Sequence, residues 1–194
     1  MGLFDFFKNK TKDIENYPTL APLKLTDIKT QKEGYLKLIN LCLGEKHKKE
    51  IINLIDTLKD YNGDDNYMTT LNFVKEYLDN KNIHFIMGLD WKQEISDLNW
   101  RVNSSLKANF NEIIELPNPE IYGLDKSISY KNVFIDFDTA INKKGYKIGF
   151  LHTDGDEYVI VIHKLADEKE VENAINMIGY NYLTAISPMI SPEN

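Results

Sequence analysis

The hydrophobic and polar positions of this chain follow two periods, and the clearest stretch of period two lies between residues 146 and 163. Two runs rich in β-branched and aromatic residues there flank an Asp154-Gly155 pair. Such a pair predicts a β-hairpin, because a type I′ turn needs positive φ at both central residues. With these two residues in the turn, His152 pairs with Glu157. Both faces of the hairpin are largely apolar, so we expect it at the centre of a sheet that is covered on both sides.

Apolar residues spaced by three and four positions predict helices on both sides of this hairpin. The predicted helices span residues 30–44, 45–59, 68–80, 91–106, 132–144 and 167–178. Thr30 is the predicted N-cap of the first helix and Asp90 that of the fourth. A strand is the alternative for residues 133–137. Further short strands are predicted at 83–89 and, on the sheet edge, at 180–186.

Together these elements predict an α+β fold, in which an N-terminal helical layer packs on a small, mostly antiparallel sheet with a central hairpin. We expect an N-terminal arm and linker over residues 1–29, a single domain over 30–186 and a C-terminal tail over 187–194. The arm begins with an apolar cluster at residues 3–7. Three interpretations of this cluster stay open: a mobile arm, an arm docked on its own domain, or a contact with a membrane surface.

The charge of the chain is unevenly distributed. Residues 1–110 contain 16 basic and 16 acidic side chains, whereas residues 111–194 contain 7 and 14, so the net charge of −7 lies in the C-terminal part. Arg101 is the only arginine. Proteins that bind nucleic acids rely on arginine and on a basic surface. We therefore expect a protein partner, with a basic partner favoured by the charge, and no nucleic acid.

The cellular compartment is predicted from the lack of a membrane-spanning segment, of a secretory signal and of a second cysteine. No run approaches the roughly 20 apolar residues that span a bilayer, and no secretory signal is recognisable at the N-terminus. Cys42 is the only cysteine, so no disulfide can form within the chain. These features predict a cytoplasmic protein without a transmembrane segment.

Catalytic and metal-binding motifs are absent from the sequence, so no cofactor is expected. Asp136 and Asp138 form a D-x-D pattern, but two residues that are two apart on a helix diverge and cannot chelate one ion. The best polar pair is His152 with Glu157, which is either a general base with its carboxylate or a surface contact. The candidate interaction or polar residues are His152, Asp154, Asp156, Glu157, Trp100 and Arg101.

Three short motifs carry a resemblance: Gly88 to Lys92, Leu116-Pro117 and Asp154 to Tyr158. In these the chain resembles an uncharacterised family of small bacterial proteins, a domain of unknown function, over roughly residues 30–185. It is also loosely similar to immunity proteins of bacterial toxin systems. With the acidic charge, these resemblances lead us to expect a non-catalytic, acidic cytoplasmic interaction protein, with toxin neutralisation as its most concrete form. The alternative is a small enzyme or ligand-binding module near His152 and Glu157.

Overall fold

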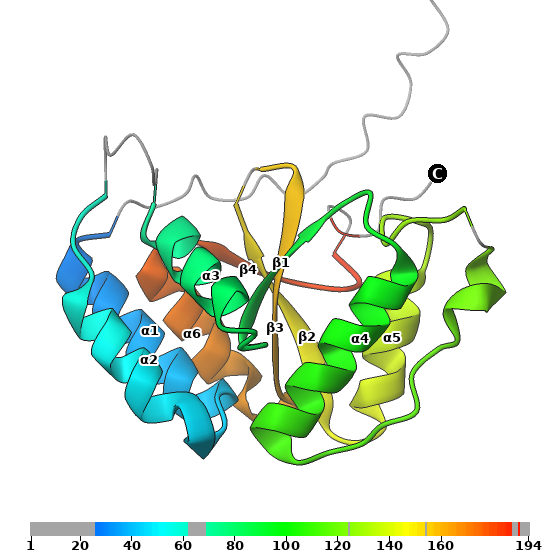
Figure 1. The fold of residues 1–194 in the computed structure, drawn as a ribbon, viewed down its shortest axis with the longest axis horizontal. Coiled ribbons are helices and arrows are strands. Elements are labelled where there is room, and N and C mark those ends of the chain that lie inside the picture. Colours follow the sequence, from blue (N-terminus) through cyan, green and yellow to red (C-terminus); the bar gives the residue numbers. More distant parts are fainter. Residues whose placement is uncertain (1–25, 62–68, 124, 154, 188–189, 191–194) are drawn as a thin grey trace, which may run out of the picture.

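The computed structural model describes residues 26–61, 69–123, 125–153, 155–187 and 190. Within them, four antiparallel strands form one sheet between two layers of helices (Figure 1). The order across the sheet is β1 (Ile86–Asp90), β3 (Glu157–Lys164), β2 (Tyr146–His152) and β4 (Asn181–Thr184). The predicted α+β class, the N-terminal helices and the central hairpin are confirmed.

Helices cover both faces of this sheet, as Figure 1 shows on its left and right sides. One layer contains α1 (Ile28–Cys42), α2 (Glu45–Thr57), α3 (Thr70–Asn80) and α6 (Glu168–Ile178). The other contains α4 (Ile95–Ser105), which a π-helical turn extends over Leu106–Phe110, and α5 (Val133–Asn142). Short 3-10 turns lie at Pro119–Tyr122 and Leu165–Asp167.

Alternation along the hairpin divides the core in two. Leu151 and Val159 pack with the first helical layer, whereas Phe150 and Ile160 pack with α4 and α5. All four side chains are at most 1% exposed. Because successive strand residues point to opposite faces, an apolar run on both faces needs a layer of helices on each. The expected coverage of both faces is therefore confirmed.

The register of the hairpin differs by one residue from the prediction. Phe150 lies opposite Ile160, and Glu157 lies opposite Asp90 of β1. The predicted pairing of His152 with Glu157 is wrong, because four residues, 153–156, connect the strands in place of a two-residue turn. This longer connection lets the even-numbered residues of both strands share the face under α4 and α5.

Two predicted helix starts are also wrong. Asp27, rather than Thr30, caps α1: its side chain accepts a hydrogen bond of 2.9 Å from the Thr30 backbone N–H. Asp90 ends β1, and its Oδ1 accepts from the Lys92 backbone N–H at 2.8 Å. This turn delays α4 to Ile95, so Trp91 is 45% exposed and does not extend the buried stripe.

The remaining elements agree with the prediction to within a few residues. Residues 133–142 form a helix and not a strand, and β4 is an edge strand. The predicted arm at residues 1–25 and the start of the third helix at Met68 lie outside the described residues. None of the helices described here has the length and apolar character that crossing a membrane requires.

Candidate functional site

The end of the hairpin keeps His152 and Glu157 on different faces of the sheet. His152 has the same parity as Phe150, which packs with α4 and α5, whereas Glu157 reaches Lys75 of α3 on the other face. Asp156 is exposed, and Asp154 lies outside the described residues. Both His152 and Glu157 line a hollow of only about 100 Å³.

Glu157 of β3 forms an ion pair that connects this strand to α3. Its carboxylate forms an ion pair with Lys75, whose side chain is 11% exposed. Gly88 makes room for this pair, because a Cβ at that position would lie 2.8 Å from Oε2 of Glu157. The carboxylate therefore holds α3 on the sheet.

The other two predicted residues, Trp100 and Arg101, lie next to each other on α4: Arg101 contacts α3, and Trp100 contacts the segment between α3 and β1. The Trp100 ring is 53% exposed, and its centroid is 4.7 Å from that of His84 in an edge-to-face contact. Arg101 forms a 3.2 Å ion pair with Asp79. Burial, followed by the charge of Arg101, lowers the pKa of His84, so a neutral imidazole supports the indole.

The exposed apolar side chains gather on one stretch of the chain. Seven large apolar side chains are exposed among the described residues. Five of them belong to α4 and its flanking segments: Trp91, Trp100, Ile113, Ile121 and Tyr130. We call these five the apolar set. Isolated exposed apolar residues are ordinary, but five of the seven fall within residues 91–130, so this stretch of the chain exposes more of them than the other described parts.

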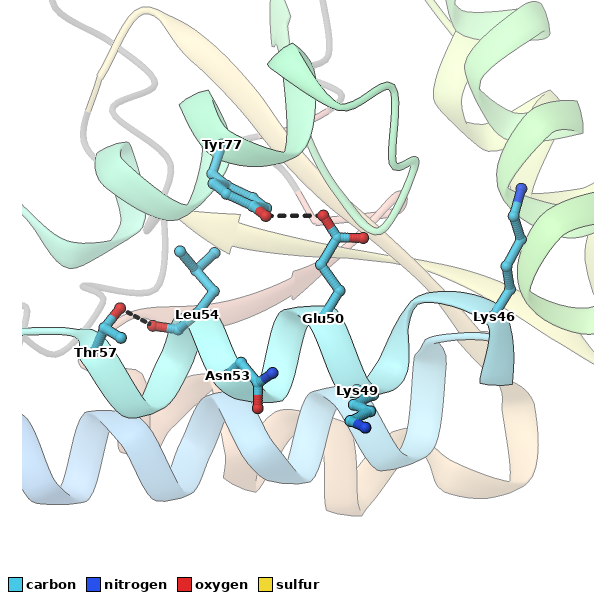
Figure 2. Close-up of a pocket in the computed structure, with 7 residues that line it drawn as sticks. All are labelled: Lys46, Lys49, Glu50, Asn53, Leu54, Thr57 and Tyr77. Carbon is cyan, nitrogen blue, oxygen red and sulfur yellow. Dashed lines mark hydrogen bonds between the residues drawn. The ribbon is translucent and has the colours of Figure 1, made fainter.

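A groove of about 630 Å³ runs between α2 and α3 (Figure 2). The Tyr77 hydroxyl donates a 2.8 Å hydrogen bond to Glu50 across it, and this bond is the first cause of the raised pKa of Tyr77. Lys46 and Lys49 also line the groove, but Figure 2 shows their side chains directed away from the Tyr77–Glu50 bond. A catalytic site requires polar groups that converge on one point, and the polar groups of this groove do not.

A second groove, of about 480 Å³, lies between α5 and the segment that precedes the 3-10 turn at Pro119–Tyr122. Its lining residues are Glu115, Leu116, Pro117, Asn118, Asp136, Thr139, Ala140 and Lys143. We call it the acidic groove. The Tyr122 hydroxyl donates a 2.9 Å hydrogen bond to Oδ2 of Asp136. Neither Glu115 nor Asp136 was predicted as a binding residue, because the path of the connecting segment brings them together.

The two carboxylates of the D-x-D pattern accept hydrogen bonds from different groups. Asp136 accepts from Tyr122, whereas Asp138 is buried and accepts from the Ile148 backbone N–H at 2.7 Å and from Asn142 at 3.1 Å. Burial raises the pKa of Asp138, since a charged carboxylate loses hydration there. Across the ranges that the structure covers, no three His, Cys, Asp or Glu side chains are arranged to hold a metal ion.

His163 forms a buried network that the sequence pattern does not reveal. Its imidazole is fully buried; Nδ1 lies 2.8 Å from the Lys164 carbonyl oxygen and Nε2 lies 2.9 Å from the Tyr182 hydroxyl. A carbonyl can only accept, so Nδ1 carries the proton and Nε2 accepts from Tyr182. Glu168, paired with Lys147 at 2.5 Å, lies 3.4 Å beyond that hydroxyl.

Comparison with known families gives one match. The sequence profile described as "Domain of unknown function (DUF6630)" matches residues 33–186. The chain belongs to this family. The expected resemblance to a domain of unknown function is thereby confirmed, and the DUF6630 match contains both grooves and the whole apolar set. No curated protein matches the chain, and no solved structure does.

Proposed function

We propose that this DUF6630 chain is a non-catalytic protein-binding module whose binding surface contains the apolar set. The exposure of these five side chains is the observation that carries the proposal. Covering a large apolar side chain gains about 1.5–3 kcal/mol, so a surface that leaves several in water gains from a partner that covers them.

Trp100 is the proposed anchor of this surface. Tryptophan and arginine are among the residue types that dominate binding energy in protein interfaces. Here the indole is supported by His84, and Arg101 is held by Asp79. Side chains that are already held in place lose less entropy on binding, which favours affinity.

Toxin neutralisation by an acidic, immunity-like protein in the cytoplasm is the concrete form of this proposal. The net charge of −7 supports a basic partner, because complementary charge accelerates association. The alternative, a small enzyme or ligand-binding module near His152 and Glu157, has less support. The hollow there measures about 100 Å³, whereas small-molecule sites usually occupy about 300–1,000 Å³.

Affinity purification of the tagged full chain from its native cells tests the proposal. Wild type is compared with Trp100→Ala and with Ile186→Ala, a matched control that is 74% exposed but lies outside the apolar set. We expect a protein that binds wild type and the control, and that binds Trp100→Ala about tenfold or more weakly when the purified components are titrated by calorimetry. An equal loss in both variants, or no specific protein, would overturn the proposal.

The toxin form has its own test. The captured partner is expressed in a heterologous host, alone and together with the chain. We expect growth arrest by the partner alone, rescue by wild type and no rescue by Trp100→Ala. A partner that leaves growth unaffected would refute toxin neutralisation while leaving the protein-binding proposal intact.

A further inference from the structure

We infer that the acidic groove receives a basic side chain of the partner, flanked there by apolar residues. This inference rests on the proposed function and specifies the partner's chemistry. The groove combines carboxylates with apolar side-chain atoms. Carboxylates are present at Glu115 and Asp136, and apolar atoms are supplied by Leu116, Pro117 and Ala140.

The carboxylate of Asp136 is oriented before any partner arrives. Tyr122 donates its hydrogen bond to Oδ2, and burial, followed by that bond, raises the pKa of Tyr122. The hydroxyl therefore keeps its proton and continues to donate. Over the described residues, no basic side chain lies within ion-pair distance of Asp136 or Glu115. Lys143 also lines the groove but forms no ion pair with either carboxylate, so an incoming ammonium or guanidinium meets an oriented carboxylate that is not already paired.

The apolar part of the partner is inferred from the apolar lining of the groove and from two exposed isoleucines that flank residues 115–118 in the sequence without lining the groove. Ile113 is 85% exposed and precedes the buried Ile114, and Ile121 is 68% exposed in the turn next to Tyr122. Lysine and arginine lay their aliphatic stems on apolar surface while the charged end stays polar. A segment with basic and branched apolar residues therefore complements both the carboxylates and the isoleucines.

A peptide titration of the full chain tests this chemistry. The probe is a seven-residue peptide with alternating leucine and lysine or arginine, and its control replaces each basic residue by glutamate. In ¹H–¹⁵N spectra at about 0.15 M salt, where the Debye length is about 8 Å, we expect shifts at residues 115–118 and 136–143. Binding of the glutamate peptide at the same residues, or equal shifts along α6, would overturn the inference.

Charge-matched variants separate the groove from net charge. Glu115→Gln with Asp136→Asn should weaken the basic peptide about tenfold or more, since a hydrogen bond to a charged group is lost. Glu170→Gln with Glu172→Gln removes the same charge from the exposed face of α6 and should change the affinity less than about twofold. Equal weakening by both pairs would mean that the peptide responds to net charge alone.

Two further measurements test the orientation of the Asp136 carboxylate and whether a second copy of this chain occupies the acidic groove. Tyr122→Phe keeps every charge but releases Asp136, and should weaken the peptide severalfold. An unchanged affinity would contradict the role of the fixed carboxylate. Sedimentation velocity tests whether a second copy places Lys46 or Lys49 in the groove. Self-association that Lys46→Gln with Lys49→Gln abolishes would assign the groove to that copy and overturn the inference.

The natural partner separates this inference from the proposed function. If Trp100→Ala releases the partner and the Glu115→Gln, Asp136→Asn pair does not, the protein-binding proposal stands and the acidic groove is not its binding site. If the pair and Trp100→Ala each weaken the partner, both proposals are supported. If neither changes its affinity, both fail.

Discussion

Acid should destabilise this fold through His163. The imidazole is fully buried, and burial lowers its pKa; the Lys164 carbonyl and the charge of Glu168 oppose this shift, while Lys147 adds to it. The unfolded chain has an ordinary imidazole, which takes up a proton below a pH of about 6.5. Between that pH and the lower pKa of the folded state, the unfolded chain binds more protons, so stability falls as the pH falls.

The loss of unfolding free energy has an upper limit, because His163 takes up only one proton. A single group whose pKa is lowered on folding changes the free energy of unfolding by at most about 1.4 kcal/mol per pH unit within that window. Protonation also forces a rearrangement, because Nε2 would then donate to Tyr182 and the tyrosine proton would turn to Glu168, 3.4 Å away. This second bond is longer, so it compensates only part of the cost.

Urea unfolding of wild type and of His163→Gln, at pH 7.5 and at pH 5.5, measures the effect. Glutamine keeps one donor and one acceptor but does not titrate, whereas His84, whose pKa is also lowered, remains in both proteins. We expect wild type to lose about 1 kcal/mol more than the variant over this interval. Nitrogen-15 spectra of wild type should also show the proton on Nδ1. Equal losses in the two proteins would refute the buried-imidazole argument.

Three other substitutions test the fold. Leu98→Ala should cost about 2–5 kcal/mol in denaturant melts, because Leu98 is fully buried on the inner face of α4, and a loss below about 0.5 kcal/mol would contradict that packing. Gly34→Ala should destabilise by about 1–3 kcal/mol although alanine favours helices, since its methyl would lie 2.7 Å from the Ala174 carbonyl oxygen; stabilisation would show that α1 and α6 can separate. His152→Ala should change the free energy of unfolding by less than about 1 kcal/mol, and a larger loss in a thermal melt would assign it a structural role.

The elements that the sequence predicted correctly are those that depend on local periodicity. Leu98 and Val102 belong to an apolar stripe that can only be buried if α4 lies on the sheet, and both are fully buried. The helix over residues 133–142 has apolar residues at helical spacing, but the sequence alone left a strand open for residues 133–137. The hairpin register was not predictable from the turn alone. It also depends on β1, which pairs with β3 through contacts about 70 residues apart in the chain.

The sequence could identify single exposed residues of the candidate site, but not the contacts between residues that are distant in the chain. Trp100 was predicted as a candidate interaction residue and is exposed, but its contact with His84 depends on how the segment before β1 packs against α4. The acidic groove requires Glu115 and Asp136 to meet across a connection with no regular period. Tyr182 reaches His163 only because β4 returns beside β2. Such pairings are set by tertiary packing, for which a sequence pattern carries no local signal.

The two helical layers also bear on the kind of partner that this architecture favours. With both faces of the sheet covered, a polar strand residue such as His163 is enclosed in an internal network and cannot meet a ligand. The grooves described above therefore lie on helices and connecting segments. An open groove of this kind leaves most of a small molecule in contact with water, whereas a pocket normally buries about 70–90% of a ligand. A protein partner that covered such a groove together with exposed apolar side chains would gain the apolar burial that a small ligand forgoes.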